Sequence, residues 1–416
     1  MRSVILSAVL IISSPALPQQ PIDPQVQARI DQILEKTPLI DGHNDLPWAL
    51  RQDHDYRIEG LESGTAGRKS PLMTDMARLH KGRVGAQLWS VYISAETKGD
   101  EAIRQTIEQL DAVDRLVKAY PRDLEWARTA DDIVRIHKMG RIASMAGVEG
   151  GDQTGNNLAV LRQFYRLGAR YMTLTHSKTT GWADSATDAP KHGGLSPFGV
   201  KVVEEMNRLG MLVDLSHVSE ETMADALDAT KAPVIFSHSS ARAVNGHPRN
   251  VPDSILRRLP ANGGVAMVNF YTGFVSEPYR QWNARRAAED ARLKSLNPGD
   301  PKAVEQGMKD WLAANAVPLA TIEEVADHIE HIARIAGHDH VGIGADLDGV
   351  DLAPKGLDSV DGYPMIFAEL IKRGWSDQNL AKLAGGNFLR VLRQAEAVAA
   401  TMKDVPAALD KLSSAS

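Results

Sequence analysis

Short apolar runs recur along this chain, and most are rich in the β-branched side chains that favour buried strands. They occupy residues 39–41, 86–92, 142–148, 171–175, 211–215, 234–236, 265–270 and 341–345. Longer stretches with helical spacing lie between them, at 101–119, 158–167, 197–209, 219–228 and 321–336, several opened by a Ser, Thr or Asp cap. Eight strands alternating with helices predict a (β/α)8 TIM-like barrel, whose functional residues lie at the C-terminal ends of the strands.

Five of these strand ends carry a side chain that can bind metal or act in catalysis. His43 and Asp45 lie two residues apart where the first run meets a Gly and a Pro, so both can leave one face of an extended strand end. The other four such residues follow later runs: Glu149, His176, His217 and His238. Imidazoles and carboxylates without sulfur suit Zn²⁺, and two zinc ions held by a bridging carboxylate can share one hydroxide nucleophile. Glu149 is the only acid among the central strand ends and is therefore the natural bridge.

The last strand and the loop after His238 add charged residues at the same mouth. Asp346 ends the eighth run, and Asp348 would lie on the same side if the strand persisted, so either carboxylate could be a base. Arg242 and Arg249 are permanent cations in the loop, where a guanidinium could clamp a substrate carboxylate in bidentate fashion. The nine remaining histidines, His328 among them, carry no such signal and stay unassigned.

Composition fits a globular enzyme with a small substrate. The chain has 416 residues, of which 43% are hydrophobic and 24% charged, enough for one large domain. A net charge of -6 and the lack of a basic stripe argue against nucleic acid as a partner. Zero cysteines exclude disulfides, a thiolate metal site and a cysteine nucleophile. The segment 278–316 is rich in charged residues and predicts a helical insertion after the seventh strand, either a solvated face or a lid.

The first twenty residues predict export. Met1-Arg2 gives a short positive region, residues 4–12 form an apolar core too short to span a bilayer, and Ser14-Pro-Ala16 offers a small-x-small cleavage site. We therefore expect a signal peptide and short tail over 1–20, one catalytic barrel over 21–400 and a polar tail over 401–416. The tail shows neither a membrane span nor a lipid-anchor signal, so the expected location is periplasmic or secreted.

The ordered set of short motifs resembles the membrane dipeptidases, also called renal dipeptidases, a zinc-dependent family of amidohydrolase-like barrels. The resemblance runs from about residue 38 to 397 through DGHNDLPW, GAQLWSVY, GVEGG, RYMTLTHS, DLSHVS, FSHSSA, RNVPD, GGVAMVNFY and GIGADLDGV. It implies a metallo-dipeptidase that cleaves dipeptides, often with a D-residue in second position, and in some members β-lactam rings. It also departs from the mammalian pattern: this chain has no cysteine for a covalent dimer, which leaves a non-covalent homodimer, and the 278–316 insertion is larger.

The resemblance also implies roles for individual residues. His43 and Asp45 would bind one zinc, His217 and His238 the other, and Glu149 would bridge them. His176 would stabilise the carbonyl oxygen of the scissile bond, Arg249 would hold the C-terminal carboxylate of the substrate, and Asp346 would be the general acid and base.

Two other functions remain open from the residues alone. The ligand set also permits a related binuclear hydrolase, such as an N-acyl amino-acid deacylase or a lactonase. A non-enzymatic exported binding protein would have lost one ligand, and none is missing.

Overall fold

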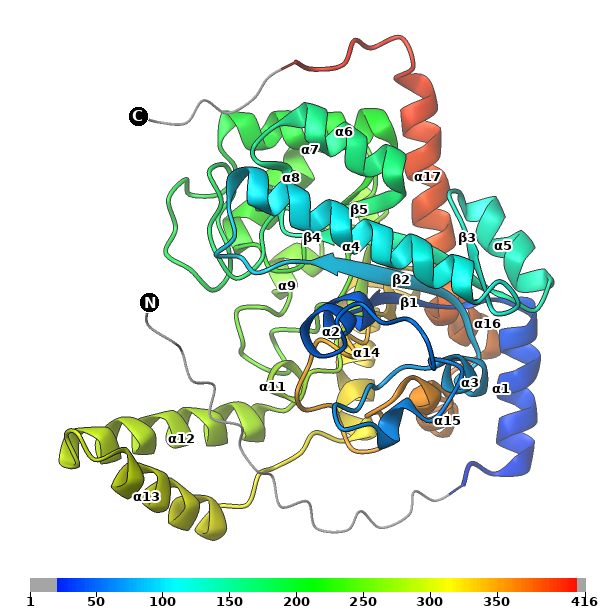
Figure 1. Ribbon diagram of the computed structural model, residues 1–416. Helices are drawn as coiled ribbons and strands as arrows, with labels where there is room; N and C mark the ends of the chain where they lie inside the picture. The colour runs from blue at the N-terminus through cyan, green and yellow to red at the C-terminus, as the bar shows by residue number, and fades with distance from the viewer. Residues whose placement is uncertain (1–20, 410–416) are drawn as a thin grey trace.

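The computed structural model describes residues 21–409 and is built around a closed parallel barrel of eight strands (Figure 1). These are β1 (Leu39–Asn44), β2 (Val84–Tyr92), β4 (Ile142–Glu149), β5 (Ala169–Thr173), β6 (Leu212–Asp214), β7 (Ile235–Phe236), β8 (Val265–Val268) and β9 (Val341–Ile343). The order β2-β1-β9-β8-β7-β6-β5-β4 is closed by a further pairing of β2 with β4. The predicted (β/α)8 barrel is confirmed, whereas the proposed signal peptide lies outside the described residues.

A ninth strand, β3 (Leu124–Trp126), was not predicted. It pairs with Ile142–Ser144 at the start of β4, on the edge that β5 occupies from Ala146 onward. Its three residues are too few to give a periodic signal. The strand therefore extends the sheet at the N-terminal end of β4 and contributes no residue to the mouth, which lies at the C-terminal ends of the strands.

Several strands are shorter than their apolar runs, because polar side chains take over the backbone hydrogen bonds beyond them. Asp214 Oδ1 accepts from the backbone N–H groups of Ser216 at 3.0 Å and Ser237 at 2.9 Å. Asn269 Oδ1 accepts from the N–H of Tyr271 at 2.5 Å. Such local side-chain bonds compete with the ladder and let the chain turn where the site residues begin.

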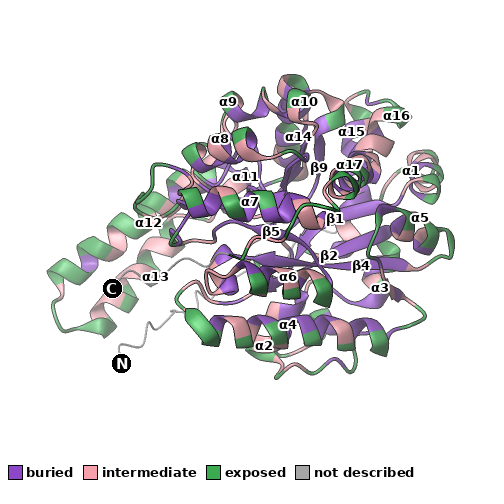
Figure 2. Ribbon diagram, turned by 90° about the horizontal axis from the view of Figure 1, so that it is seen from above, coloured by how far each residue is buried: buried purple, intermediate pink, exposed green. Residues whose placement is uncertain are grey.

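Helices cover the outside of the barrel, and buried residues concentrate on the strands and the inward helix faces (Figure 2). They are α1 (Pro24–Lys36), α2 (Leu46–Asp53), α3 (Met76–Lys81), α4 (Gly99–Ala119), α5 (Ala130–Lys138), α6 (Leu158–Leu167), α7 (Pro197–Leu209), α8 (Glu220–Ala229), α9 (Asp253–Leu256), α10 (Leu259–Asn262), α11 (Thr272–Val275), α12 (Glu277–Leu296), α13 (Pro301–Ala314), α14 (Ile322–Ala336), α15 (Tyr363–Lys372), α16 (Asp377–Ala381) and α17 (Asn387–Thr401). Caps fix several boundaries: Ser196 and Ser219 cap α7 and α8, and Thr321 forms a capping box with Glu324. Across residues 21–409, none of the helices has the length and apolar character needed to cross a bilayer.

The charged segment after β8 forms the helices α12 and α13, which project as a hairpin on the side toward which β2 points (Figure 1). We call residues 277–314 the arm. The two helices approach closely at Gly307, where a Cβ atom would lie 2.7 Å from the Leu293 side chain. None of the residues of α13 is buried. The arm therefore leaves the barrel at its C-terminal end, where the predicted site lies.

Candidate metal centre

The register of the short strands places three histidines at the same height at the mouth of the barrel. Thr173 of β5 pairs with Asp214 of β6, and Asp214 pairs with Ile235 of β7. A histidine follows each of these three positions by three residues: His176, His217 and His238. Their rings therefore lie in sequence around the mouth, with centroids 4.2 Å apart for the first pair and 5.0 Å for the second.

Glu149, the last residue of β4, lies at the centre of this arrangement and is buried. Its Oε1 is 2.9 Å from His217 Nε2 and 3.3 Å from His238 Nε2. Its Oε2 is 3.4 Å from His43 Nε2 and accepts a hydrogen bond from Ser90 Oγ at 3.0 Å. The two oxygens of one carboxylate thus face different imidazoles, Oε2 that of His43 and Oε1 those of His217 and His238, although the His43 and His238 rings lie 3.8 Å apart.

A serine and an aspartate fix the orientation of His238. Asp214 already accepts two backbone N–H groups, so the Ser237 hydroxyl donates to Asp214 Oδ2 at 2.5 Å. The same Ser237 Oγ then accepts from His238 Nδ1, 2.7 Å away. This relay places the proton on Nδ1 and leaves the lone pair of Nε2 directed at the centre.

His43 is held in a comparable way by Tyr171, whose hydroxyl lies 2.8 Å from His43 Nδ1. The Tyr171 ring is fully buried in the barrel and fits there only because residue 147 is glycine. A Cβ atom on Gly147 would lie 1.9 Å from the ring. The Nε2 atom of His43 therefore also faces the centre.

The centre fits a cation. His43 Nε2 and Asp45 Oδ1 are buried without a hydrogen-bond partner among the described residues. Three sets of residues each bring their potential ligand atoms within 4.8 Å of one another. The sets are His43 with Asp45 and Glu149, Glu149 with His217 and His238, and His43 with His238 and Asp346. Burial lowers the pKa of His217 and His238 well below the ordinary value, so both are neutral and can donate a lone pair. Nitrogen and oxygen ligands without sulfur are the set that zinc accepts.

The electrostatics at the His43 end also favour positive charge. Burial opposes protonation, yet the Tyr171 hydroxyl and the carboxylates of Glu149 and Asp45 raise the pKa of His43 well above its ordinary value. Burial also opposes ionisation of Glu149, yet the surrounding histidines, His43 and His176 foremost, lower its pKa well below the usual range. A bound metal ion would take the place of the proton that these groups attract.

Asp346 and Asp348 separate clearly in the structure. Both have a positive φ of 65°, because β9 ends at Ile343 and the chain turns instead of continuing as a strand. Asp346 Oδ1 faces His43 Nε2 at 3.9 Å, and its Oδ2 accepts from Asn269 Nδ2 at 2.7 Å. Asp348 instead accepts from the backbone N–H of Met73 at 2.6 Å. Of the two carboxylates left open by the strand pattern, Asp346 therefore faces the centre, as the resemblance implied.

The two candidate arginines also separate. Arg249 is 2% exposed and donates from Nη1 to Ser239 Oγ at 3.1 Å and from Nη2 to the His238 carbonyl at 3.3 Å. Arg242 instead binds Glu220 and the carbonyls of Pro248 and Asn250, on the outer side of its loop. Arg249 is therefore the cation adjacent to the centre.

His176 differs from the other three histidines in its exposure. Its side chain is 21% exposed, compared with 0% for His43 and 1% for His238. Its Nε2 lies 3.7 Å from Glu149 Oε1, and burial lowers its pKa. It is thus a neutral imidazole at the open edge of the centre, accessible to a bound molecule.

The comparisons with known proteins agree with this geometry. The family model described as membrane dipeptidase (peptidase family M19) matches residues 27–405. The chain belongs to peptidase family M19. It is 40% identical to the dipeptidase verJ of Clonostachys rogersoniana, over 90% of this chain and 88% of that protein. It is also 40% identical to dipeptidase 3 of Rattus norvegicus, over 90% of this chain and 69% of that protein.

Solved structures of similar proteins share the barrel of this M19 dipeptidase. The probable dipeptidase PvdM from Pseudomonas aeruginosa superposes with a TM-score of 0.74 at 26% identity, covering 90% of this chain and 99% of that one. A metallo peptidase from Rhodobacter sphaeroides, liganded with a phosphinate mimic of the dipeptide L-Ala-D-Ala, gives 0.70 at 22% identity and covers 86% and 99%. Membership of family M19 makes the protein a metallopeptidase that hydrolyses dipeptides, and it implies a metal, typically zinc.

Sequence analysis missed the residues of this M19 site that act through another side chain. They are Ser90, Tyr171, Asp214, Ser237 and Asn269. The signal that could have found them is a polar residue inside an otherwise apolar strand or directly before a ligand. Ser237 comes just before His238, and Asp214 interrupts an apolar run.

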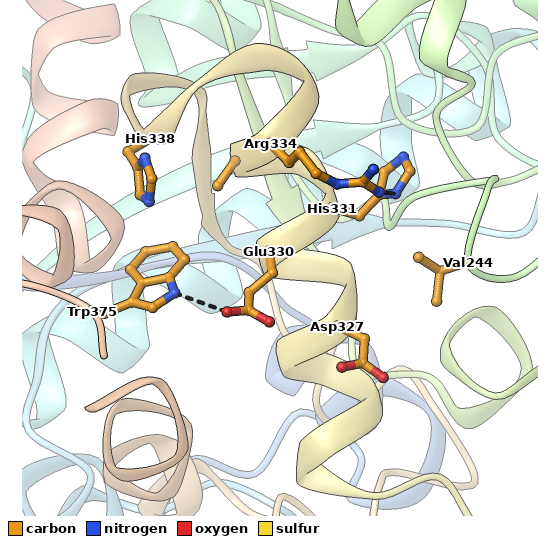
Figure 3. A pocket seen from close by; sticks show the side chains of 8 residues that line it. Val244, Asp327, Glu330, His331, Arg334, His338 and Trp375 are labelled. Atoms are coloured by element: carbon orange, nitrogen blue, oxygen red, sulfur yellow. Dashed lines mark hydrogen bonds between the residues drawn. The ribbon is translucent and has the colours of Figure 1, made fainter. Parts of the chain in front are cut away.

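An open cleft of about 620 Å³ lies elsewhere on the dipeptidase, on the outer face of α14 (Figure 3). Its charged groups already have partners: Arg373 binds Asp327 at 2.6 Å and Glu330 at 2.8 Å, and Trp375 Nε1 donates to Glu330. It includes none of the predicted ligands. We therefore assign the chemistry to the smaller, buried centre at the barrel mouth.

Proposed function

We propose that this dipeptidase holds two zinc ions and that Glu149 bridges them. The observation that carries the proposal is the division of its carboxylate, with Oε2 3.4 Å from His43 and Oε1 2.9 Å from His217. His43 and Asp45 would hold one ion, and His217 and His238 the other. Zinc in such a site supplies Lewis acidity to the substrate carbonyl and lowers the pKa of water.

His176, Asp346 and Arg249 would act on the substrate. The neutral, partly exposed imidazole of His176 would donate a hydrogen bond to the carbonyl oxygen of the scissile bond as negative charge develops there. Burial raises the pKa of Asp346 well above its usual range, which suits a carboxylate that accepts a proton and returns it to the leaving amine. Asn269 holds one of its oxygens and leaves the other directed at the centre.

Arg249 would select the length of the substrate. Burial lowers the pKa of its guanidinium to about 10, so it stays charged at neutral pH, while its Nε has no partner among the described residues. A carboxylate one residue beyond the scissile bond would satisfy this charge in bidentate fashion. The substrate would thus be a dipeptide with a free C-terminus, including dipeptides with a C-terminal D-residue, as the resemblance implies.

We also propose that the enzyme is exported to the periplasm or beyond. The support is the sequence of residues 1–20, with its positive start, apolar core and Ser14-Pro-Ala16. N-terminal sequencing of the protein from the host's extracytoplasmic fraction would test this. A start shortly after Ala16 is expected, whereas an intact Met1 in a protein confined to the cytoplasm would contradict it.

The metal proposal is tested by titrating the metal-free protein with zinc and following bound zinc together with the hydrolysis rate of an L-L dipeptide. Two zinc ions per chain are expected, with full activity only when both are bound. Glu149→Gln should bind less zinc and lose activity. The control is Glu369→Gln, which changes a buried carboxylate on α15 and should keep the zinc content and the activity of the wild type. Full activity at one zinc per chain would overturn the binuclear site.

A further inference from the structure

The guanidinium of Arg249 has an aromatic ring over its face. Arg249 Cζ lies 5.2 Å from the centroid of the Phe274 ring, within the distance at which a cation and a ring attract each other. One edge of the guanidinium is held by Ser239 and the His238 carbonyl. Phe274 therefore restricts the tilt of a group that has hydrogen bonds on only part of its edge.

The turn that carries Phe274 is tied to the loop that carries Arg249. Asn250 Nδ2 donates to the Phe274 carbonyl at 2.8 Å, and Asn245 Nδ2 donates to the Gly273 carbonyl at 3.3 Å. His328, fully buried on α14, joins the same two segments. Its Nδ1 accepts from the backbone N–H of Ala241 at 2.9 Å, so its Nε2–H donates to the Val275 carbonyl at 2.9 Å. The segments that carry Phe274 and Arg249 are thus held together by hydrogen bonds.

The same ring lies in a row of aromatic contacts that starts at His247, 4.6 Å from Phe274, and leads into the arm. Phe274 meets Tyr271 edge to face at 4.8 Å, and Tyr271 meets Tyr279 at 6.5 Å. Tyr279 stacks on Trp282 at 5.6 Å, and Trp282 contacts Trp311 of α13 at 5.6 Å. Phe274 is therefore held by the polar bond to the loop and by its direct contact with Tyr271, whereas the rings of the arm reach it only through Tyr271.

We propose that Phe274 is a positioning residue for substrate selection: it holds the plane of the Arg249 guanidinium so that its fork meets the substrate carboxylate. The inference rests on the proposed role of Arg249 and adds a residue that need not touch the substrate. A bidentate pair depends on the two groups being coplanar, so loss of the ring weakens carboxylate binding without removing the charge. The chemistry at the metal centre should be unaffected, because the ring contacts and hydrogen bonds of Phe274 within residues 21–409 go to Arg249, His247, Tyr271 and Asn250 and not to a proposed ligand.

The test compares Phe274→Leu, Phe274→Tyr and Arg249→Lys in the zinc-loaded enzyme, with a dipeptide and its C-terminal amide as substrates. Phe274→Leu should raise KM for the dipeptide by roughly 5- to 30-fold with kcat little changed, because the cation–π contact that fixes the guanidinium plane is lost and the fork of Arg249 then meets the substrate carboxylate less well. The amide should show little change, so discrimination between the two substrates falls. Phe274→Tyr retains the ring and should restore both values.

Trp282→Leu is the matched control, since it removes a ring of the same row at a distance from Arg249. It should leave KM and discrimination unchanged. Equal KM values for Phe274→Leu and the wild type, or an equal rise for dipeptide and amide, would overturn the role of Phe274. Failure of the Arg249 clamp itself is distinguishable, since the wild type and Arg249→Lys would then treat the dipeptide and its amide alike.

Discussion

The metal centre and the arm lie on the same side of the barrel but differ in how far their side chains are buried and how firmly they are oriented. At the centre, His43 and His238 are fully buried, and a hydroxyl group at the Nδ1 atom orients each ring, that of Tyr171 for His43 and that of Ser237 for His238. On the arm, α13 has no buried residue (Figure 2), and its charges form exposed pairs such as Lys309 with Glu305. Exposed pairs of this kind contribute about 0–1 kcal/mol each. Single atoms therefore matter at the centre, whereas on the arm function should tolerate substitution.

The largest effect is expected for Asp346→Asn. Asn keeps the shape and can still hydrogen-bond with Asn269, but it cannot accept and return a proton. The rate constant kcat should fall by roughly a hundredfold or more while zinc content stays at the wild-type level. Steady-state kinetics together with elemental analysis would measure both.

Asp348→Asn provides the matched control, because Asp348 has the same φ of 65° but binds the Met73 backbone. Burial raises the pKa of Asp348 to about 6, so its folded form retains a proton to higher pH than the unfolded chain. The protonated carboxyl of Asp348 thus adds to the free energy of unfolding at low pH, and this contribution is lost as the pH rises through about 6. Asp348→Asn should abolish this pH dependence of stability. The kcat should stay near normal. A hundredfold loss in Asp348→Asn, with Asp346→Asn unaffected, would exchange the two roles.

An intermediate effect is expected for Ser237→Ala, which removes the relay from Asp214 to His238. Without the hydroxyl, the Nδ1 proton of His238 has lost its acceptor, and the Nε2 lone pair is no longer enforced. Zinc affinity should fall by roughly 10- to 100-fold, as for other residues that orient a ligand. Competition with a metal-binding dye would measure it.

Ser239→Ala tests whether that loss is specific to the relay. Ser239 lies two residues further along the chain and accepts a hydrogen bond from Arg249 rather than from a ligand. Its replacement should raise KM and leave zinc affinity unchanged. Equal loss of zinc in both variants would show that the loop as a whole, not the relay, determines affinity.

The same contrast explains what the sequence could predict. The proposed ligands follow apolar runs in a local pattern, so the barrel and the candidate site residues His43, Glu149, His217 and His238 could be predicted from their own neighbourhoods. Tyr171 could not be assigned to His43, because 128 residues separate them and only closure of the barrel brings them together. The apolar pattern alone could not choose between Asp346 and Asp348, because a positive φ leaves no signal in it; the resemblance to the family made that choice.

The smallest effect is expected for Trp311→Ala on α13. Trp311 is partly exposed, and its ring packs against Trp282 of α12. The kinetic constants should stay within twofold of wild type, because three rings separate Trp311 from Phe274. The loss of packing should instead open the arm locally, so limited proteolysis should cut near the turn at 297–300 faster while the barrel unfolds at nearly the same temperature. A large fall in kcat in this variant would mean that the arm takes part in catalysis, and the division between centre and arm would then have to be abandoned.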